Sequence, residues 1–199
     1  EFDSNANVAY NVPINFKCNK HHINKELFFK SLVSLIKRHE ILRTVIHEDE
    51  DNNNEIRQFI LNEKSVDQLF LFIEETCENL NAVDFKLNSL LDFKFNLRND
   101  IPIKALFLEN KENNETYFYV GILLHHICFD GWSYPIFIRD LQAIYEHYKS
   151  NCSLSLPSID IQYKDYSVWQ KDYLKDNKLS KLIEYWKNKL HEFENLNLK

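Results

Sequence analysis

The sequence predicts an α/β fold in which helices cover a mixed sheet. Segments with apolar residues at helical spacing, such as Asn24–His39, are interspersed with segments typical of strands, such as Pro102–Leu108. The clearest strand pattern, Thr116–His126, is apolar on both faces, as is typical of a strand inside a covered sheet. Because strands and helices do not alternate strictly, we expect a mixed sheet rather than an all-parallel one.

The first part of the chain predicts a strand, a helix, a hairpin and a second helix. Asn24 and Ser65 stand where side-chain oxygens would cap the two helices. In chain order, these elements are expected over Asn7–Cys18, Asn24–His39, Leu42–His47 paired with Glu55–Leu61 across a turn at Asn52–Asn54, and Val66–Asn79.

The second part predicts two more strands followed by three helices. Asn88–Leu97 fits neither pattern. Ser133 is expected to cap the first of the three helices. The expected elements are the strand Pro102–Leu108, a turn at Asn110–Asn114, the strand Thr116–His126, the helix Ser133–Tyr148, a loop at Ser150–Pro157, and the helices Tyr163–Tyr173 and Leu179–Phe193.

Composition excludes several classes of partner. The net charge is -6 and no Lys/Arg cluster could follow a phosphate backbone, so no nucleic acid is expected. The longest apolar run, Tyr117–Leu124, is too short to span a bilayer, so no membrane is expected either. Four cysteines without C-x-x-C spacing favour reduced thiols and a cytoplasmic location. Methionine is absent, and we expect an internal segment of a longer polypeptide.

The strand Thr116–His126 ends in two histidines, within the stretch HHICFDGWS. Neighbouring side chains on a strand point to opposite faces, so His125 and His126 are expected to differ, one structural and one functional. A neutral imidazole at the end of a strand could accept a proton at physiological pH. Asp130 is expected to fix the following turn. Gly131 is expected to allow a tight turn or the close approach of a ligand.

Other interpretations of these residues remain open. Both histidines could be hydrogen-bonded core residues. A zinc site built on His126, Cys128 and Asp130 lacks a recognisable fourth ligand, so no metal is expected. A Ser-His-Asp triad is disfavoured because no G-x-S-x-G turn is present and Ser133 serves better as a helix cap.

HHICFDGWS resembles the HHxxxDG motif of condensation domains from nonribosomal peptide synthetases. Three more stretches resemble motifs of that family in the same order: AYNVP from Ala9, RHEILRT from Arg38 and YKDYSVWQ from Tyr163. The similarity spans about Ala9 to Leu190. It implies a fold like chloramphenicol acetyltransferase, in which two lobes enclose a tunnel. Residues 1–199 would then be a partial domain: the N-terminal lobe, to about residue 175, and the start of a connection to a missing C-terminal lobe.

The resemblance implies peptide-bond formation. An acyl group would pass from a thioester on a donor carrier to the amine of an aminoacyl thioester on an acceptor carrier. His126 is implied to be catalytic, and Asp130 to form a structural ion pair with an arginine of the second lobe. Gly131 is implied to let the backbone approach the thioester. Supporting roles around the site are implied for His125, Arg38, Arg43, the helix-capping Ser133 and the packing residues Trp132 and Trp169.

The resemblance also implies partners. No cofactor would bind directly, and 4′-phosphopantetheine would arrive on donor and acceptor peptidyl carrier domains. The C-terminal lobe and an adenylation domain would belong to the same polypeptide. The DGWS continuation is similar to the subtype that joins two L-configured residues. A related HxxxD acyltransferase, an epimerisation domain and a non-catalytic carrier-docking remnant remain alternatives. A heterocyclisation domain does not, because HHxxxDG is intact.

Overall fold

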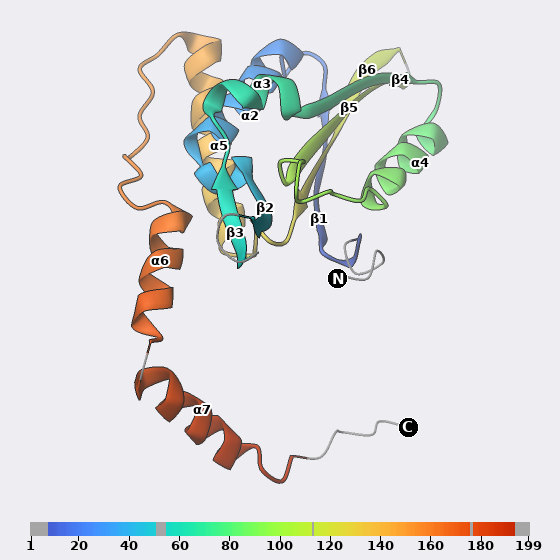
Figure 1. Cartoon of the computed structure of the whole chain (residues 1–199). Coiled ribbons are helices and arrows are strands. Elements are labelled where there is room, and N and C mark those ends of the chain that lie inside the picture. Colours follow the sequence, from blue (N-terminus) through green and yellow to red (C-terminus); the bar gives the residue numbers. More distant parts are fainter. Residues whose placement is uncertain (1–7, 51–54, 113, 176, 194–199) are drawn as a thin grey trace. The chain divides into compact units, whose positions relative to one another are not determined.

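The computed structural model describes residues 8–50, 55–112, 114–175 and 177–193 (Figure 1). The chain divides into two compact units, Glu1–Ser158 and Ile159–Lys199, and each is described by itself. The positions predicted at Asn7 and Asn52–Asn54 lie outside the described residues.

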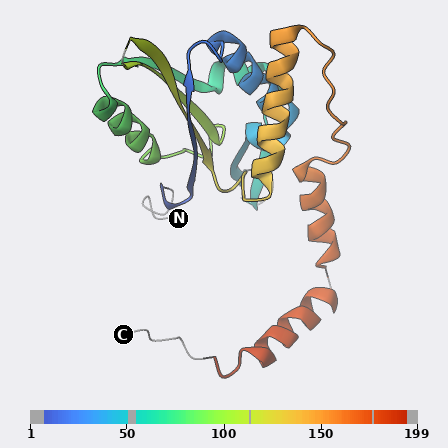
Figure 2. The ribbon, with the colours of Figure 1, turned by 180° about the vertical axis from the view of Figure 1, so that it is seen from behind.

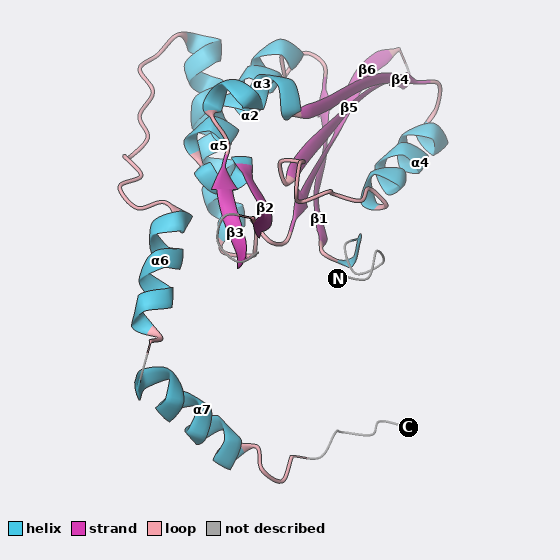
Figure 3. Cartoon of the chain, in the orientation of Figure 1, coloured by secondary structure: helices cyan, strands magenta, loops and turns pink. Residues whose placement is uncertain are grey.

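A four-stranded mixed sheet forms the centre of the first unit (Figure 3). Its order is β1 (Asn11–Asn19), β6 (Glu115–His125), β5 (Ile103–Glu112) and β4 (Leu71–Cys77). β6 pairs antiparallel with both β1 and β5, whereas β4 runs parallel to β5. The predicted α/β class with a mixed sheet is therefore confirmed.

Helices cover both faces of this sheet (Figures 1 and 2). α2 (Lys25–Arg38) and α5 (Ser133–Ser150) pack on one face through Phe28, Leu32 and Phe137, against strand residues such as Phe107. α4 (Leu80–Leu91) covers the other face. There Val83 and Leu90 join a smaller cluster that includes Leu106, Leu108 and Leu123. Two covered faces explain why β6 is apolar on both sides.

A separate hairpin of β2 (Thr44–Asp49) and β3 (Glu55–Ile60) follows α2. A short 3₁₀ helix, η1 (Glu40–Arg43), precedes β2, so the strand begins later than the predicted Leu42. Asn24 accepts a hydrogen bond from the backbone N–H of Leu27 at 3.0 Å, and its predicted role as N-cap of α2 is confirmed.

The predicted helix Val66–Asn79 is wrong. α3 (Glu63–Leu69) is capped by Asn62 rather than Ser65, and the chain then forms β4. Pairing of the whole of Leu71–Cys77 with β5 outweighs the helical spacing of its apolar residues. Asn79 caps the unpredicted helix α4 and accepts from the N–H of Ala82 at 2.9 Å. β5 also continues to Glu112, through part of the predicted turn.

The second unit contains α6 (Tyr163–Tyr173) and α7 (Asn177–Lys189). α6 is predicted correctly, and its N–H at Gln162 donates to Asp165 Oδ2 at 2.9 Å. Tyr166, Trp169 and Tyr173 form a column of rings, with centroids 5.6 and 5.1 Å apart. None of the described side chains of this unit is buried. Across the described part of the chain, no helix has both the length and the apolar character that crossing a membrane requires.

Candidate functional site

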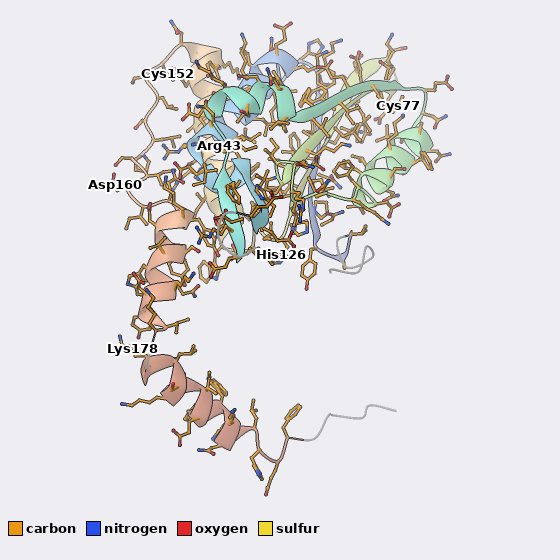
Figure 4. The ribbon with its side chains drawn as sticks, in the orientation of Figure 1. Arg43, Cys77, His126, Cys152, Asp160 and Lys178 are labelled. Atoms are coloured by element: carbon orange, nitrogen blue, oxygen red, sulfur yellow. The ribbon has the colours of Figure 1, made fainter. Side chains whose placement is uncertain are left out.

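The two histidines lie where β6 leaves the sheet, and Figure 4 marks His126 at this end. The N–H of His125 donates to the carbonyl of Pro102 at 3.0 Å, and that of His126 to the carbonyl of Tyr10 at 2.7 Å. The pair is thereby fixed to the segments that precede both neighbouring strands. The N–H of Cys128 then donates to the carbonyl of His125 at 3.0 Å and closes a turn.

His125 is buried, with 6% of its surface exposed. Its Nδ1 accepts a hydrogen bond from the N–H of Ile127 at 3.1 Å, which places the proton of the neutral ring on Nε2. The rings of Tyr10 and Phe95 flank it, with centroids 6.1 and 6.0 Å away. Burial, followed by repulsion from His126, lowers the pKa of His125. This imidazole is therefore a neutral, fixed part of the fold.

His126 is exposed. The ring of Tyr10 meets it edge-on at 6.4 Å between centroids. Within the described residues, its imidazole makes no hydrogen bond to another side chain or to the backbone. The structure therefore places one ring of the pair in the interior and leaves the other available to a ligand.

Asp130 and Ser133 close the loop that follows. Asp130 Oδ1 accepts from the N–H of Ser133 at 2.8 Å and from its Oγ at 2.6 Å. These hydrogen bonds lower the pKa of Asp130. Ser133 is the first residue of α5, and the N-cap position belongs to Trp132. The predicted cap by Ser133 is therefore wrong, because its hydroxyl donates to Asp130 instead. Among the described residues no arginine pairs with Asp130.

Gly131 and Trp132 are both exposed. Gly131 lies in the turn before α5 and has no positive φ, so the backbone of this turn does not depend on glycine. A Cβ added to it would meet no atom within 4 Å, which leaves room for the approach of a ligand. Trp132 is 85% exposed, so its implied packing role is wrong within the described chain. Trp169, with 55% of its surface exposed, contacts the neighbouring rings of its own helix.

Arg38 belongs to a buried ionic network centred on Asp140. Asp140 is fully buried in α5, and its Oδ2 accepts from Arg38 Nε and His39 Nε2, both at 2.9 Å. Arg139 donates to the other carboxylate oxygen at 2.7 and 2.9 Å. Burial alone would raise the pKa of Asp140, but these hydrogen bonds hold it below its ordinary value. The network ties the end of α2 to the helix that follows the histidine loop.

Sequence reasoning missed His39 and Asp140. A signal was present, because Asp140 shares a helix face with Phe137, Leu141 and Ile144, where a carboxylate needs partners. Burial lowers the pKa of His39 more than Asp140 raises it, so His39 is neutral near pH 7.

Arg43 supports a different junction. It is buried, and it donates from Nε to the carbonyl of Lys37 at 3.3 Å and from Nη1 to the carbonyl of Leu61. These bonds connect the end of α2 to the end of the hairpin. Arg38 and Arg43 thus both act within the fold.

A small pocket of ≈ 120 Å³ lies beside the loop, lined by His39, Ile41, Cys128, Phe129 and Ile136 among others. Burial raises the pKa of the Cys128 thiol to about 12, so this cysteine is not a nucleophile at neutral pH. In the ranges that the structure covers, no three His, Cys, Asp or Glu side chains are grouped as metal ligands.

Sequence comparisons identify relatives of this chain. It is 27% identical over 199 residues to N-(5-amino-5-carboxypentanoyl)-L-cysteinyl-D-valine synthase of Penicillium chrysogenum. It is 30% identical over 184 residues to a linear gramicidin synthase protein of Brevibacillus parabrevis. These relatives are nonribosomal peptide synthetases. The alignments cover 100% and 92% of this chain but only 5% and 2% of the relatives.

Solved structures share the fold. The epimerization domain from the third module of tyrocidine synthetase B superposes with a TM-score of 0.76 at 16% identity, covering 96% of this chain and 42% of that domain. The starter condensation domain of rhizomide synthetase gives a TM-score of 0.74 at 14% identity, covering 94% and 44%. The family described as Condensation domain matches residues 3–198. The chain belongs to the condensation-domain family.

Proposed function

We propose that this chain supplies the histidine-bearing half of a condensation site that joins two carrier-bound substrates through an amide bond. The observation that carries the proposal is the contrast within the histidine pair: His126 is exposed on a turn whose backbone is anchored to Tyr10, beside a buried and neutral His125. The anchored backbone fixes the position of residue 126, and exposure leaves its imidazole free to meet a substrate.

The chemistry needed at this imidazole is modest. The donor thioester is already activated. The α-amine of the acceptor attacks its carbonyl carbon, a C–N bond forms and the C–S bond breaks. An α-amine with a pKa near 8 is mostly protonated at neutral pH. His126 accepts a proton from the attacking nitrogen, and the departing thiolate takes up a proton in turn. General base catalysis of this kind contributes roughly 10²–10⁴ in rate.

The neighbouring residues keep the loop in register. Asp130 and Ser133 fix the chain between the histidines and α5. The open space at Gly131 allows the thioester to lie close to the backbone. The partners in this scheme are donor and acceptor peptidyl carrier domains with 4′-phosphopantetheine arms, together with a second lobe and an adenylation domain in the same polypeptide.

A reconstitution assay tests the class of reaction. The full-length protein receives an acyl thioester on a donor carrier and an aminoacyl thioester on an acceptor carrier, and products are followed by intact-protein mass spectrometry in deuterated buffer. We expect a dipeptidyl acceptor carrier that requires both loaded carriers.

Other products would point elsewhere. Deuterium incorporation at the α-carbon of one aminoacyl thioester, without transfer, would indicate epimerisation. Transfer to a free amine without an acceptor carrier would indicate a related acyltransferase. No reaction, with carriers still bound, would indicate a docking role. Each of these results contradicts the proposal.

A further inference from the structure

A second pocket lies away from the histidines, at the junction of α3, β4 and β5. It has a volume of ≈ 140 Å³, and its walls are mostly apolar, including Leu69, Leu71, Phe93, Phe95 and Ile101. Two charged groups, the ammonium of Lys104 and the carboxylate of Asp100, line it as well. Lys104 lies on β5 between Leu71 of β4 and Leu123 of β6.

The ammonium group of Lys104 is held against an aromatic wall. Its Nζ lies 3.9 Å from the centroid of the Phe93 ring, and Phe93 packs edge-on against Phe95 at 4.9 Å. Burial lowers the pKa of Lys104, and Asp100 offsets this only in part. Asp100 Oδ2 accepts a hydrogen bond from the N–H of Asn96 at 2.8 Å, so this carboxylate also serves the local turn.

Several other lysines of the first unit have carboxylate partners. Lys17 pairs with Glu112 at 2.9 Å, and Lys20 pairs with Glu109 at 3.1 Å. Among the described residues, no carboxylate lies within ion-pair distance of Lys104 Nζ. A partly desolvated ammonium group without an anion carries a cost in free energy, which a bound anion would remove.

We propose that this pocket binds an anionic group joined to a short aliphatic segment. Lys104 anchors the anion, and Leu71, Phe93 and Phe95 enclose the aliphatic part. The volume is close to that of a cavity of about 150 Å³ that holds one benzene, which corresponds to roughly six carbon atoms. The anion is either the carboxylate of an acyl group or the phosphate of a pantetheine arm. The proposal concerns binding alone and does not depend on amide formation at His126.

The test uses hexanoate and its neutral counterpart hexanamide, titrated against the full-length protein by ligand-observed NMR. We expect hexanoate to bind at least about tenfold more tightly, because a charged hydrogen bond distinguishes the two probes. Lys104→Met should abolish that preference, and Lys104→Arg should keep it. The matched control is Lys111→Met, an exposed lysine on the same strand, which should leave the preference unchanged.

Competition then distinguishes the two sources of the anion. If 4′-phosphopantetheine displaces hexanoate and pantetheine does not, the phosphate of the arm is the anion. If neither displaces it, a carboxylate-bearing acyl group is favoured. Equal binding of hexanoate and hexanamide, absence of saturable binding, or a preference that survives Lys104→Met would overturn the proposal. Lys104→Arg changes the side chain but keeps the positive charge. If it binds hexanoate and Lys104→Met does not, the loss in Lys104→Met is due to the charge rather than to unfolding.

Discussion

At the end of β6, burial gives two neighbouring histidines different properties. His125 is enclosed by Tyr10 and Phe95 and remains neutral, whereas its neighbour His126 faces outward. The sequence could predict that the two side chains differ, because a strand alternates its faces. It could not predict which ring is buried, since that depends on Phe95, from a segment that matched no regular pattern.

The lowered pKa of His125 predicts that acid weakens this strand. The unfolded chain takes up a proton near pH 6.5, above the pH at which folded His125 does so. Its contribution to stability is therefore complete above about pH 6.5 and is lost as the pH falls toward the folded pKa. His39 acts in the same direction. We expect hydrogen-exchange protection of residues 116–126, corrected for intrinsic rates, to fall between pH 7 and pH 5.

Asp130 and Asp140 do not contribute to the change in stability expected between pH 7 and pH 5. Asp130 and Asp140 have lowered pKa values, so their contributions are lost only at lower pH. His125→Gln should flatten the pH dependence, with the part due to His39 remaining. Protection that stays constant or rises on acidification would show that His125 is not buried as a neutral ring.

We expect alanine substitution of the two glycines in the chain to change stability by different amounts. At Gly121 a Cβ would lie 2.9 Å from Leu87 Cδ2 and 3.0 Å from Leu90 Cδ2, so Gly121→Ala should cost about 1–3 kcal/mol of stability. Gly131→Ala meets nothing, and stability should change by less than about 0.5 kcal/mol. If the substrate approaches the backbone there, Gly131→Ala should still lower turnover at least about tenfold. Hydrogen exchange and the amide-forming assay measure the two effects, and unchanged turnover in Gly131→Ala would refute the close approach.

At the scale of elements, the Asp140 network joins α2 to α5. Asp140→Asn leaves Arg38 with a weaker partner in a largely buried setting. Breaking such a pair costs about 3–5 kcal/mol when it is fully buried, and the exposure of Arg139 reduces this. We expect a loss of about 2–3 kcal/mol in the opening free energy of α2 and α5, measured by hydrogen exchange.

A surface carboxylate provides the control for that variant. Asp67 pairs with Lys37, also on α2, at 2.9 Å, and more than half of the Asp67 side chain is exposed. Asp67→Asn should cost less than about 1 kcal/mol. Equal effects of the two substitutions would mean that the Asp140 network does not join the helices.

Elements with a local signal were predictable, and those that depend on distant pairing were not. The Asn24 cap identified α2, and continuous apolar runs identified β5 and β6. β4 was missed because its apolar spacing also fits a helix, and only pairing with β5, some thirty residues away, decides the outcome. The same holds for the site. The loop after β6 could be recognised from its local sequence, whereas the Asp140 network forms only because α2 and α5 are in contact.

At the scale of the whole molecule, the two hydrophobic clusters consist only of residues before Ser158. α6 and α7 contribute no buried side chain among the described residues. A chain ending at Ser158 should therefore keep exchange protection in β5 and β6. The separate segment 159–199 should be largely unfolded in far-UV circular dichroism, because helices this short are marginal alone. Loss of protection in the shortened chain would show that the first unit does not fold independently.

The exposure of Trp132 depends on the whole fold, and it was not predictable from the residues next to it in sequence. The family resemblance implied a packing role for Trp132, yet the first unit leaves it 85% exposed. The fold class followed from segment patterns, whereas the exposure of a loop residue depends on every element that reaches the loop.

The most direct test of the central claim is the single-turnover rate of amide formation in His126→Ala, measured in the full-length protein with both carriers loaded. His22→Ala, which removes another exposed histidine of the same unit, is the control. We predict a loss of about 10²–10⁴ in His126→Ala with carrier affinity unchanged, and the wild-type rate in His22→Ala. A wild-type rate in His126→Ala would contradict the claim that this imidazole takes part in the transfer.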